Sequence, residues 1–338
     1  MRNDEIGDKS VRDIEIKMQK SKQGGNFVMK RRSIQKLVVF AVMCLFLMGV
    51  SVTGYAQTCP AGAICRDEAP GAYTGNGPYG YSSYTLPWTS YSAGATVYYP
   101  RTATAPFSAI VFMQPYTGTQ AMNYAWGPWF ASHGIVYVNC DSTTTLDTVD
   151  SRATQQMNAI NALKNENNRS ASPLYRKLDT SRIGVMGWSM GGGASWINSA
   201  NSSIKTAMSL AGHNLTAVSI YKSGRYTKCP TMIFSGLLDT TYLGGMGQSE
   251  GVYRNIPSGI AKIHYEVRSA GHMAWGSPTS ASSNVAKIAL AFQKTFLDGD
   301  TRWAAYLTQP SDASTWNTAS LPSTGGTTPD YPWWYWWR

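Results

Sequence analysis

A serine enclosed by glycines, directly after a short apolar segment, is the feature that most restricts what this chain can fold into. Residues 185–193 read V-M-G-W-S-M-G-G-G and contain the pattern G-x-S-x-G around Ser189. A serine on a sharp strand-to-helix turn adopts an unfavourable backbone conformation, and only neighbours as small as Gly187 and Gly191 leave room for it. The helix that follows such a turn favours negative charge at its N-terminus. The pattern in this context predicts a nucleophilic serine.

The rest of the chain alternates between strand-like and helix-like segments. Apolar, strand-like runs occupy residues 95–99, 107–113, 135–138, 183–186, 231–234 and 263–267. Helical spacing is found in residues 126–132, 151–164 and 285–297. This alternation favours a mostly parallel central sheet with helices on both faces. Together with the serine turn, it predicts a domain of the α/β-hydrolase fold over residues 57–310.

Composition and charge exclude one class of partner. Of the 338 residues 43% are hydrophobic, enough for one large core, and only 14% are charged, which is typical of an extracellular surface. The net charge of +10 falls to about +5 without residues 1–56, since these hold ten Lys/Arg and five Asp/Glu. No stripe of basic residues and no nucleic-acid motif remains, so nucleic acid is not an expected partner.

The N-terminal region has the organisation of an export signal. Basic residues in the segment 30–36 precede an apolar run, residues 37–52, which is short for a membrane span. Small residues in the segment 54–56 predict cleavage after Ala56, and Met29 is expected to be the true start. A membrane anchor is the alternative. A cleaved signal predicts a secreted protein, extracellular or periplasmic, without stable membrane insertion after the signal is removed.

Cysteine placement indicates one disulfide and no metal centre. Cys59 and Cys65 lie close together after the expected cleavage site and are expected to close a small loop in an oxidising compartment. Cys140 and Cys229 each border a strand-like run and are expected to be buried free thiols. No C-x-x-C pattern or Cys/His cluster occurs in the sequence. We therefore expect no metal and no other cofactor.

The C-terminal segment differs in composition from the rest. From residue 311 the chain is rich in Ser, Thr, Pro and Gly, which predicts a linker over residues 311–338 that ends in a Trp-rich tail at 331–338. The tail is typical of a segment that binds surfaces. Residues 321–325, L-P-S-T-G, resemble a sortase signal, but only a short aromatic segment follows them instead of a long apolar helix.

A neutral serine hydroxyl group needs a base, and the sequence offers four histidines. His133 precedes the serine, and His213 follows an apolar stretch soon after it. His264 lies in a strand with alternating character and is interpreted as a structural surface residue. His272 lies in the small-residue segment S-A-G-H after a strand. Because the base comes last in the chain order of this fold, we expect His272 to be the base.

The base needs an acid that orients it, and two aspartates follow strand-like runs. Asp239 comes after the run 231–234 and lies between Ser189 and His272, as the chain order of the fold requires. Asp141 precedes the serine, and a loop-capping role explains it. We therefore expect Ser189, Asp239 and His272 to form a catalytic triad, with Asp141 as the alternative acid.

Acyl transfer also needs two backbone N–H groups that hold the oxyanion. One is expected to be that of Met190, directly after the serine. The other is assigned to Tyr116, in the segment Q-P-Y-T-G that follows the strand-like run 107–113. The loss of one such donor typically lowers the rate by a factor on the order of 10²–10³.

Three segments together resemble one family of bacterial enzymes. They are G-W-S-M-G-G-G at 187–193, W-G-P-W-F-A-S-H-G at 126–134 and A-G-A-T-V-Y-Y-P at 93–100. These segments resemble the cutinase-like poly(ethylene terephthalate) hydrolases, a group of polyester hydrolases of the α/β-hydrolase fold. The resemblance extends over residues 77–301, most of the chain that follows the expected signal.

The resemblance implies the same triad and a shallow aromatic cleft for polymer segments. Tyr116 and Trp188 match positions that line this cleft, and Met273, beside the base, is expected to line it, with ordinary packing as the alternative. His213 stands where the family usually has a Trp that clamps the substrate ring, which implies weaker stacking on aromatic polyesters. Some members brace the acid and base loops with a disulfide, and Gly236 excludes that bridge here.

The expected function is that of a secreted, monomeric serine esterase that hydrolyses cutin-like aliphatic or poly(ethylene terephthalate)-like aromatic polyesters. A lipase or carboxylesterase for soluble short-chain esters is the alternative, since it would share the triad and differ only in the shape of its cleft. A third interpretation is a non-catalytic protein that binds surfaces through its Trp-rich tail, and an intact candidate triad argues against it.

Overall fold

The structure is a computed structural model, and it describes residues 58–241 and 246–322. The strands in these residues are β1 (Tyr81–Thr85), β2 (Ala95–Pro100), β3 (Phe107–Met113), β4 (Val136–Cys140), β5 (Leu178–Trp188), β6 (Thr206–Leu210), β7 (Thr231–Gly236), β8 (Lys262–Val267) and β9 (Ala313–Ala319). The helices are α3 (Trp126–Ser132), α4 (Val149–Glu166), α5 (Met190–Asn198), α6 (Met246–Asn255) and α7 (Ser283–Phe296), with short 3-10 helices η1 (Gln120–Met122), η2 (Ile220–Ser223) and η3 (Thr301–Tyr306). The expected export signal and the Trp-rich tail lie outside the described residues.

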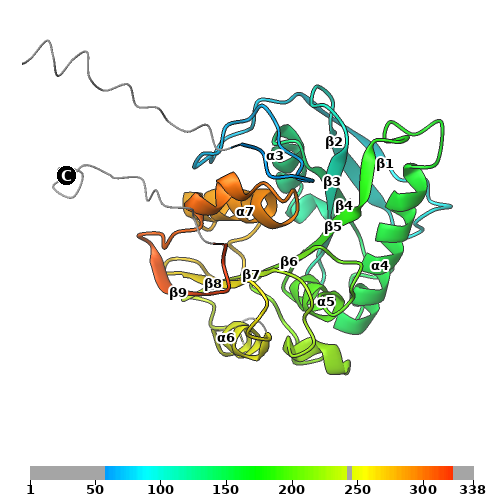
Figure 1. Cartoon of the computed structure of the whole chain (residues 1–338). Helices are drawn as coiled ribbons and strands as arrows, with labels where there is room; N and C mark the ends of the chain where they lie inside the picture. The colour runs from blue at the N-terminus through cyan, green and yellow to red at the C-terminus, as the bar shows by residue number, and fades with distance from the viewer. Residues whose placement is uncertain (1–57, 242–245, 323–338) are drawn as a thin grey trace, which may run out of the picture. The chain divides into compact units, whose positions relative to one another are not determined.

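The strands form one sheet in the order β1-β2-β4-β3-β5-β6-β7-β8-β9 (Figure 1). Neighbours from β4 to β8 are parallel, whereas β1, β2 and β9 pair antiparallel at the two sides of the sheet. Every residue of β3, β4, β6, β7 and β8 is buried. Such continuous burial is expected of parallel strands that are covered on both faces.

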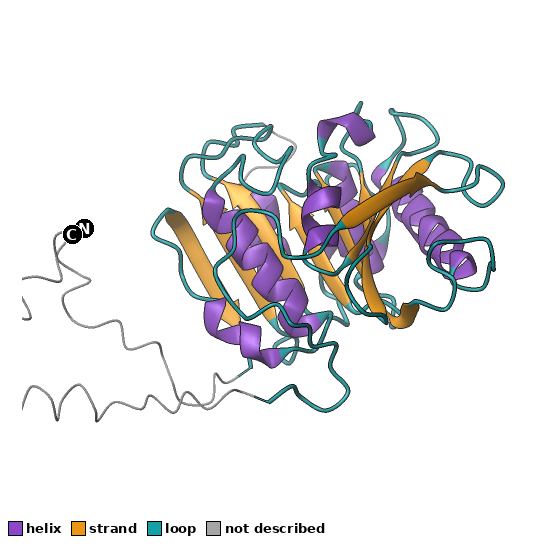
Figure 2. Ribbon diagram, turned by 90° about the horizontal axis from the view of Figure 1, so that it is seen from above, coloured by secondary structure: helices purple, strands orange, loops and turns teal. Residues whose placement is uncertain are grey.

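Helices cover both faces of the sheet (Figure 2). On one face, Trp126 of α3 and Leu290 of α7 belong to one buried apolar cluster with the strands. On the other face, Ile160 of α4 and Ala194 of α5 belong to a second cluster, and Val252 of α6 packs in a third. The predicted fold class, a mostly parallel sheet between two layers of helices, is therefore confirmed.

The parallel register brings the ends of the central strands to one edge of the sheet. Met113, the last residue of β3, pairs with Gly187 of β5. Gly236, the last residue of β7, pairs with Val267, the last residue of β8. The loops that follow β3, β5, β7 and β8 therefore meet at this carboxyl edge.

The last described segment corrects the linker prediction. Residues 313–319 form β9, which pairs antiparallel with β8, so the chain does not leave the fold at residue 311. The ring of Trp316 packs edge-on against that of Tyr265 with centroids 5.8 Å apart, and Asp312 accepts a 2.6 Å hydrogen bond from the Tyr265 hydroxyl group. The Ser and Thr residues that suggested a linker suit an edge strand, because Thr favours extended backbone and such a strand keeps contact with solvent.

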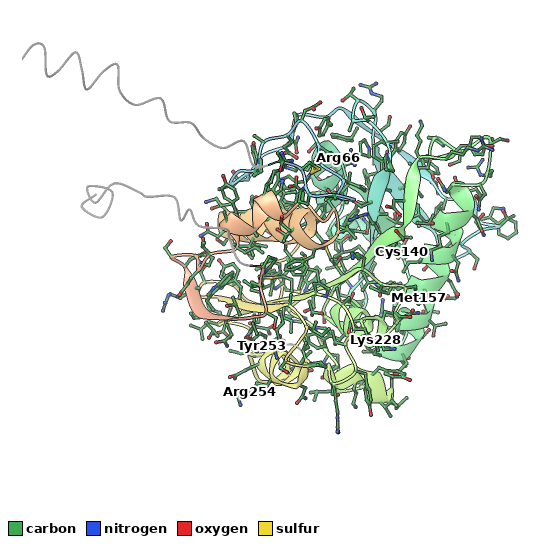
Figure 3. The ribbon with its side chains drawn as sticks, viewed as in Figure 1. Arg66, Cys140, Met157, Lys228, Tyr253 and Arg254 are labelled. Atoms are coloured by element: carbon green, nitrogen blue, oxygen red, sulfur yellow. A yellow bond between two sulfur atoms is a disulfide. The ribbon has the colours of Figure 1, made fainter. Side chains whose placement is uncertain are left out.

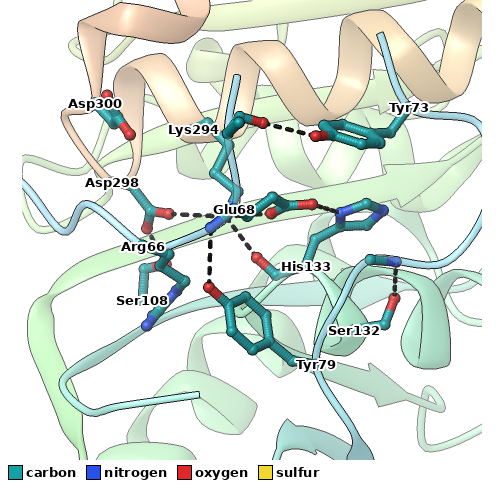
Figure 4. Close-up of polar contacts among 12 residues, drawn as sticks. Arg66, Glu68, Tyr73, Tyr79, Ser108, Ser132, His133, Lys294, Asp298 and Asp300 are labelled. Atoms are coloured by element: carbon teal, nitrogen blue, oxygen red, sulfur yellow. Dashed lines mark hydrogen bonds and ion pairs between the residues drawn. The ribbon is translucent and has the colours of Figure 1, made fainter. Parts of the chain in front are cut away.

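A buried cluster of charged side chains ties the segment before β1 to α3 and α7 (Figure 4). Glu68 contacts Nδ1 of His133, which follows α3, and its other oxygen lies 3.2 Å from Nζ of Lys294 on α7. The same Nζ lies 3.8 Å from a carboxylate oxygen of Asp298. All four side chains are buried. Because the loss of one partner from a buried ion pair typically costs about 3–5 kcal/mol, the cluster holds these segments together.

His264 is buried, which corrects its interpretation as a surface residue. Its side chain in β8 is 1% exposed, and its Nε2 atom lies 2.8 Å from the hydroxyl oxygen of Ser235 on β7. The ring of Tyr253 on α6 lies over it, with ring centroids 6.1 Å apart. Burial lowers the pKa of His264 to about 4.

This pKa predicts a loss of stability in mild acid. Between about pH 6.5 and pH 4 the unfolded chain binds a proton at His264 that the folded chain does not, so the free energy of unfolding falls as the pH falls through this range. At 1.36 kcal/mol per pKa unit the loss approaches about 3 kcal/mol at pH 4. We expect His264→Gln to lose roughly 2–3 kcal/mol less than the parent between pH 7 and pH 4.5 in urea unfolding. Equal losses in both proteins would exclude His264 as the responsible group.

Candidate active site

Ser189 occupies a strained turn between β5 and α5. Its backbone has φ 53° and ψ −117°, a conformation that side-chain-bearing residues rarely adopt. Its N–H group donates a 2.9 Å hydrogen bond to the carbonyl oxygen of Leu210 at the end of β6. Its own carbonyl oxygen accepts hydrogen bonds from the N–H groups of His213, at 2.8 Å, and Gly193, at 3.0 Å. These bonds hold the strained turn in place.

Three glycines allow the backbone around this turn to pack closely. A Cβ atom on Gly187 would lie 2.2 Å from the carbonyl oxygen of Gly191, and one on Gly191 would lie 2.0 Å from that of Met113. A Cβ atom on Gly193 would lie 1.9 Å from the carbonyl oxygen of His213. No side chain fits at these distances. The first turn of α5 therefore rests directly on the end of β3 and on the segment after β6.

Ser189, His272 and Asp239 form a chain of hydrogen bonds at the carboxyl edge. Nε2 of His272 lies 3.0 Å from Oγ of Ser189, and Nδ1 of His272 lies 2.8 Å from Oδ2 of Asp239. The three residues follow β5, β8 and β7, respectively. The His272 side chain is 12% exposed, whereas that of Asp239 is completely buried. The geometry suits a serine nucleophile, a base that removes its proton and an acid that orients the base.

The carboxylate of Asp239 is held in its charged form. Thr241 donates to Oδ1 with its hydroxyl group and, at 3.2 Å, with its backbone N–H. Burial alone would raise the pKa of Asp239, but the hydrogen bonds from His272 and Thr241 outweigh burial and lower it. Sequence analysis did not select Thr241, although the segment D-T-T contains the signal of a carboxylate that accepts a bond two residues further on.

Trp188 lies below the site and does not line an open cleft, which corrects the expectation for this residue. It is 2% exposed and belongs to the apolar cluster under α3 and α7. Its indole N–H donates a 2.9 Å hydrogen bond to the backbone carbonyl oxygen of His272. As the last residue of β5, Trp188 thereby links the strand that carries Ser189 to the loop that carries His272.

His213 is also buried, so the expectation that it lines the cleft is wrong for this structure. It is 1% exposed, and its Nε2 atom lies 3.4 Å from the hydroxyl oxygen of Thr216. Its backbone contributes to the site through the hydrogen bond to Ser189. The ring cannot stack on a substrate without leaving this position.

The expected oxyanion donors lie on the two segments that meet at Gly191. Met190 is the first residue of α5, and Tyr116 lies in the turn after β3. Close contact between Gly191 and Met113 brings these two segments together. Thr117, next to Tyr116, has a positive φ of 58° and donates a 2.8 Å hydrogen bond to the carbonyl oxygen of Thr145. The turn after β3 is thus fixed from the side of the loop after β4.

Exposed apolar side chains lie on the loops at the same carboxyl edge as Ser189, His272 and Asp239. Tyr116, Leu238 and Met273 are 47%, 59% and 66% exposed, on the loops after β3, β7 and β8. Leu146 and Leu215 are exposed on the loops after β4 and β6. The carboxyl edge therefore presents an apolar rim, which suits an extended apolar substrate better than a small polar one.

The remaining candidates have structural surroundings. Asp141 accepts hydrogen bonds from the backbone N–H and the side chain of Gln120, at 2.9 and 2.7 Å, as a loop-capping carboxylate does. Cys59 and Cys65 form a disulfide with their Cα atoms 5.9 Å apart. Cys140, which Figure 3 labels, lies at the end of β4; it is buried, and so is Cys229. Burial raises the pKa of both thiols, which keeps them protonated.

The described part of the chain shows neither a metal centre nor a helix suited to span a membrane. Residues 58–241 and 246–322 contain no group of three or more His, Cys, Asp or Glu side chains arranged to hold a metal ion. Within the same ranges, no helix combines the length and the apolar character that a membrane span requires.

Comparison with known proteins relates this chain to ester hydrolases. A family model described as PET hydrolase-like matches residues 68–323. Cutinase 1 of Thermobifida cellulosilytica is 36% identical over 236 residues, which cover 69% of this chain and 85% of that protein. A cutinase of Thermobifida fusca is equally identical over the same length, covering 74% of that protein. A bis(hydroxyethyl) terephthalate hydrolase of Streptomyces coelicolor is 34% identical over 218 residues, 63% of this chain and 65% of that protein.

The buried carboxylate beside His272 generates a prediction for Asp239→Asn. An amide cannot stabilise a protonated imidazole and favours the wrong tautomer of the base, so we expect kcat on a soluble ester to fall by about 10⁴-fold. The lowered pKa of Asp239 keeps its carboxylate charged throughout the neutral range, so kcat of the parent can be measured there without protonation of this group.

Asp141→Asn is the matched control, since Asp141 also follows a strand of the sheet and its carboxylate accepts hydrogen bonds from Gln120. We expect this variant to keep kcat within a few-fold of the parent. A large loss in Asp141→Asn with little loss in Asp239→Asn would reverse the assignment of the acid.

Proposed function

The chain belongs to the PET hydrolase-like family, and we propose that it hydrolyses ester bonds of polyesters by acyl transfer to Ser189. The resemblance to cutinase-like hydrolases noted in the sequence agrees with this family. The observation that carries the proposal is the chain of hydrogen bonds from Ser189 through His272 to Asp239, at the edge where the apolar rim lies.

The mechanism has two chemical steps. His272 takes the proton of Ser189 as Oγ attacks the ester carbonyl carbon, and the N–H groups of Met190 and Tyr116 hold the negatively charged oxygen. His272 then gives the proton to the departing alcohol, which leaves an acyl-enzyme. A water molecule, activated by the same imidazole, releases the acid and restores Ser189. Asp239 stabilises the charged imidazole in both steps.

The apolar rim supports a polymeric rather than a small substrate. Tyr116, Leu238 and Met273 are exposed on three loops beside Ser189, and a polymer segment can cover all of them. The buried position of His213 leaves no ring of that residue at the surface. We therefore expect faster hydrolysis of aliphatic than of aromatic polyesters.

The test compares the purified protein with Ser189→Ala on a suspension of aliphatic polyester nanoparticles and on a soluble short-chain ester. We expect the parent to clear the suspension and Ser189→Ala to lose at least about 10⁴-fold in rate on both substrates, because alanine has no hydroxyl oxygen that could attack the ester. Ser202→Ala, an exposed serine after α5, is the control and should keep parental activity.

Two outcomes would change this assignment. Activity of the parent on the soluble ester without any clearing would favour a carboxylesterase for small substrates. Full activity of Ser189→Ala would remove the serine from the mechanism altogether.

We also propose that the protein is exported and cleaved after Ala56. The basic segment and the apolar run of residues 30–52 support export, and the disulfide between Cys59 and Cys65 suits an oxidising compartment. N-terminal sequencing of the protein from the culture medium or periplasm should find Gln57 first. An uncleaved protein in the membrane fraction would favour the anchor instead.

A further inference from the structure

Arg152 is a buried arginine that joins the two loops beside the proposed oxyanion hole. It lies on the first turns of α4 and is 0% exposed. One terminal nitrogen donates hydrogen bonds to the carbonyl oxygen of Gln114, at 3.2 Å, and to the hydroxyl group of Ser142, at 2.8 Å. The other donates to the carbonyl oxygen of Thr145 at 2.7 Å, and Nε donates to that of Asp147 at 3.1 Å.

The partners of this guanidinium group are unusual for a buried charge. Among the described residues no carboxylate lies within ion-pair distance of Arg152. The carboxylate of Asp147 instead accepts from the N–H of Thr144, at 2.9 Å, and from the side chain of Gln155, at 2.8 Å. A buried cation without an ion pair is costly, and an arginine is suited to this place because its planar fork of donors can bind several fixed acceptors at once.

The guanidinium group is connected to the residues that flank Tyr116 in the sequence. Gln114 lies two residues before Tyr116, and its carbonyl oxygen binds Arg152 directly. Thr117 lies one residue after Tyr116, and its N–H group donates to the same carbonyl oxygen of Thr145 that Arg152 binds. The guanidinium group thus connects, directly or through one carbonyl group, to the backbone on both sides of Tyr116.

The turn after β3 is strained and is therefore stabilised by contacts from outside it. Thr117 has a φ of 58°, so the backbone directly after Tyr116 adopts a conformation that is unfavourable for threonine. The side chain of Gln114 is also fixed, since it donates to Asn139 at 2.6 Å and accepts from Asn123 at 2.7 Å. Without Arg152, the backbone of Gln114 would lose its bond to the guanidinium group, and Thr145, which accepts from Thr117, would lose the second bond that holds it in place.

We propose that Arg152 is a positioning residue that sets the N–H group of Tyr116 for the oxyanion. The inference rests on the proposed function, because it presupposes acyl transfer at Ser189. Arg152 touches no reacting atom, and its effect passes through the backbone of Gln114 and Thr117. Because a displacement of about 1 Å at a reacting group can lower a rate by about 10²-fold, a looser turn should lower the rate without preventing substrate binding.

The experiment compares Arg152→Lys with Arg182→Lys. Lysine keeps the charge but cannot bind the carbonyl groups of two loops in one plane. Arg182 is the matched control, since it also donates to a carbonyl group, that of Leu297 at 2.8 Å, but lies in the amino-terminal half of β5, away from the site. Active sites are counted by the burst of p-nitrophenol from a p-nitrophenyl phosphate triester, so that any unfolded fraction is excluded from kcat.

We expect Arg152→Lys to lower kcat per active site on a soluble ester by about 10- to 100-fold, with KM within about twofold of the parent. The inhibition constant of phenylboronic acid, whose adduct with Ser189 places an oxygen in the oxyanion hole, should rise by a similar factor. Arg182→Lys should change neither value by more than about twofold, even where it lowers the melting temperature.

A parental kcat per active site in Arg152→Lys, with only a lower melting temperature, would overturn the proposal. If Arg152→Lys does not fold, Ser142→Ala decides, since it removes one partner of the guanidinium and should weaken phenylboronic acid roughly two- to fivefold. Unchanged inhibition in Ser142→Ala would then count against the proposal. A parent without esterase activity would refute the proposed function itself. Failure of the proposed function is thereby distinguished from failure of the proposal for Arg152.

Discussion

The close packing of glycine backbone around Ser189 is the constraint on which the rest of the site depends. Gly191 lets the first turn of α5 contact the end of β3, and Gly193 lets it contact the segment after β6. Because backbone contacts backbone at these glycines, the strained serine lies close to the segments that carry the proposed oxyanion donors. The loops after β7 and β8 then bring Asp239 and His272 to Ser189, whose backbone is already fixed.

Two sets of buried polar side chains, one at each end of the strands, serve different purposes. At the amino ends, Glu68 and Lys294 join the segment before β1 to α7, which stabilises the domain far from the proposed chemistry. At the carboxyl ends, Trp188 holds the backbone of His272, and Arg152 holds the loops after β3 and β4. Each of these groups spans segments distant in sequence, so the site depends on side chains that do not contact substrate.

The residues of the proposed triad could be selected from the sequence, whereas the burial of several residues around them could not. Small neighbours identify Ser189, and the chain order of the fold selects Asp239 and His272 among few candidates. The resemblance to the hydrolase family implied that Trp188 and His213 stand at the substrate cleft, but both are buried. Alternation in β8 suggested an exposed His264, yet α6 covers that side. Local patterns report which residue types a turn or strand tolerates, and burial depends on what packs against them.

The sequence by itself determined the fold class and selected Ser189 as the candidate nucleophile, because a strand-to-helix turn with a positive φ demands glycine neighbours that are visible in the chain. Only the tertiary structure decided how the turn is completed. The strand β9 at residues 313–319, the exposed rim around Tyr116 and Met273, and the bonds of Arg152 all join segments that are far apart in the chain. Such contacts depend on the packing of the whole sheet with its helices, which no local pattern of residues encodes.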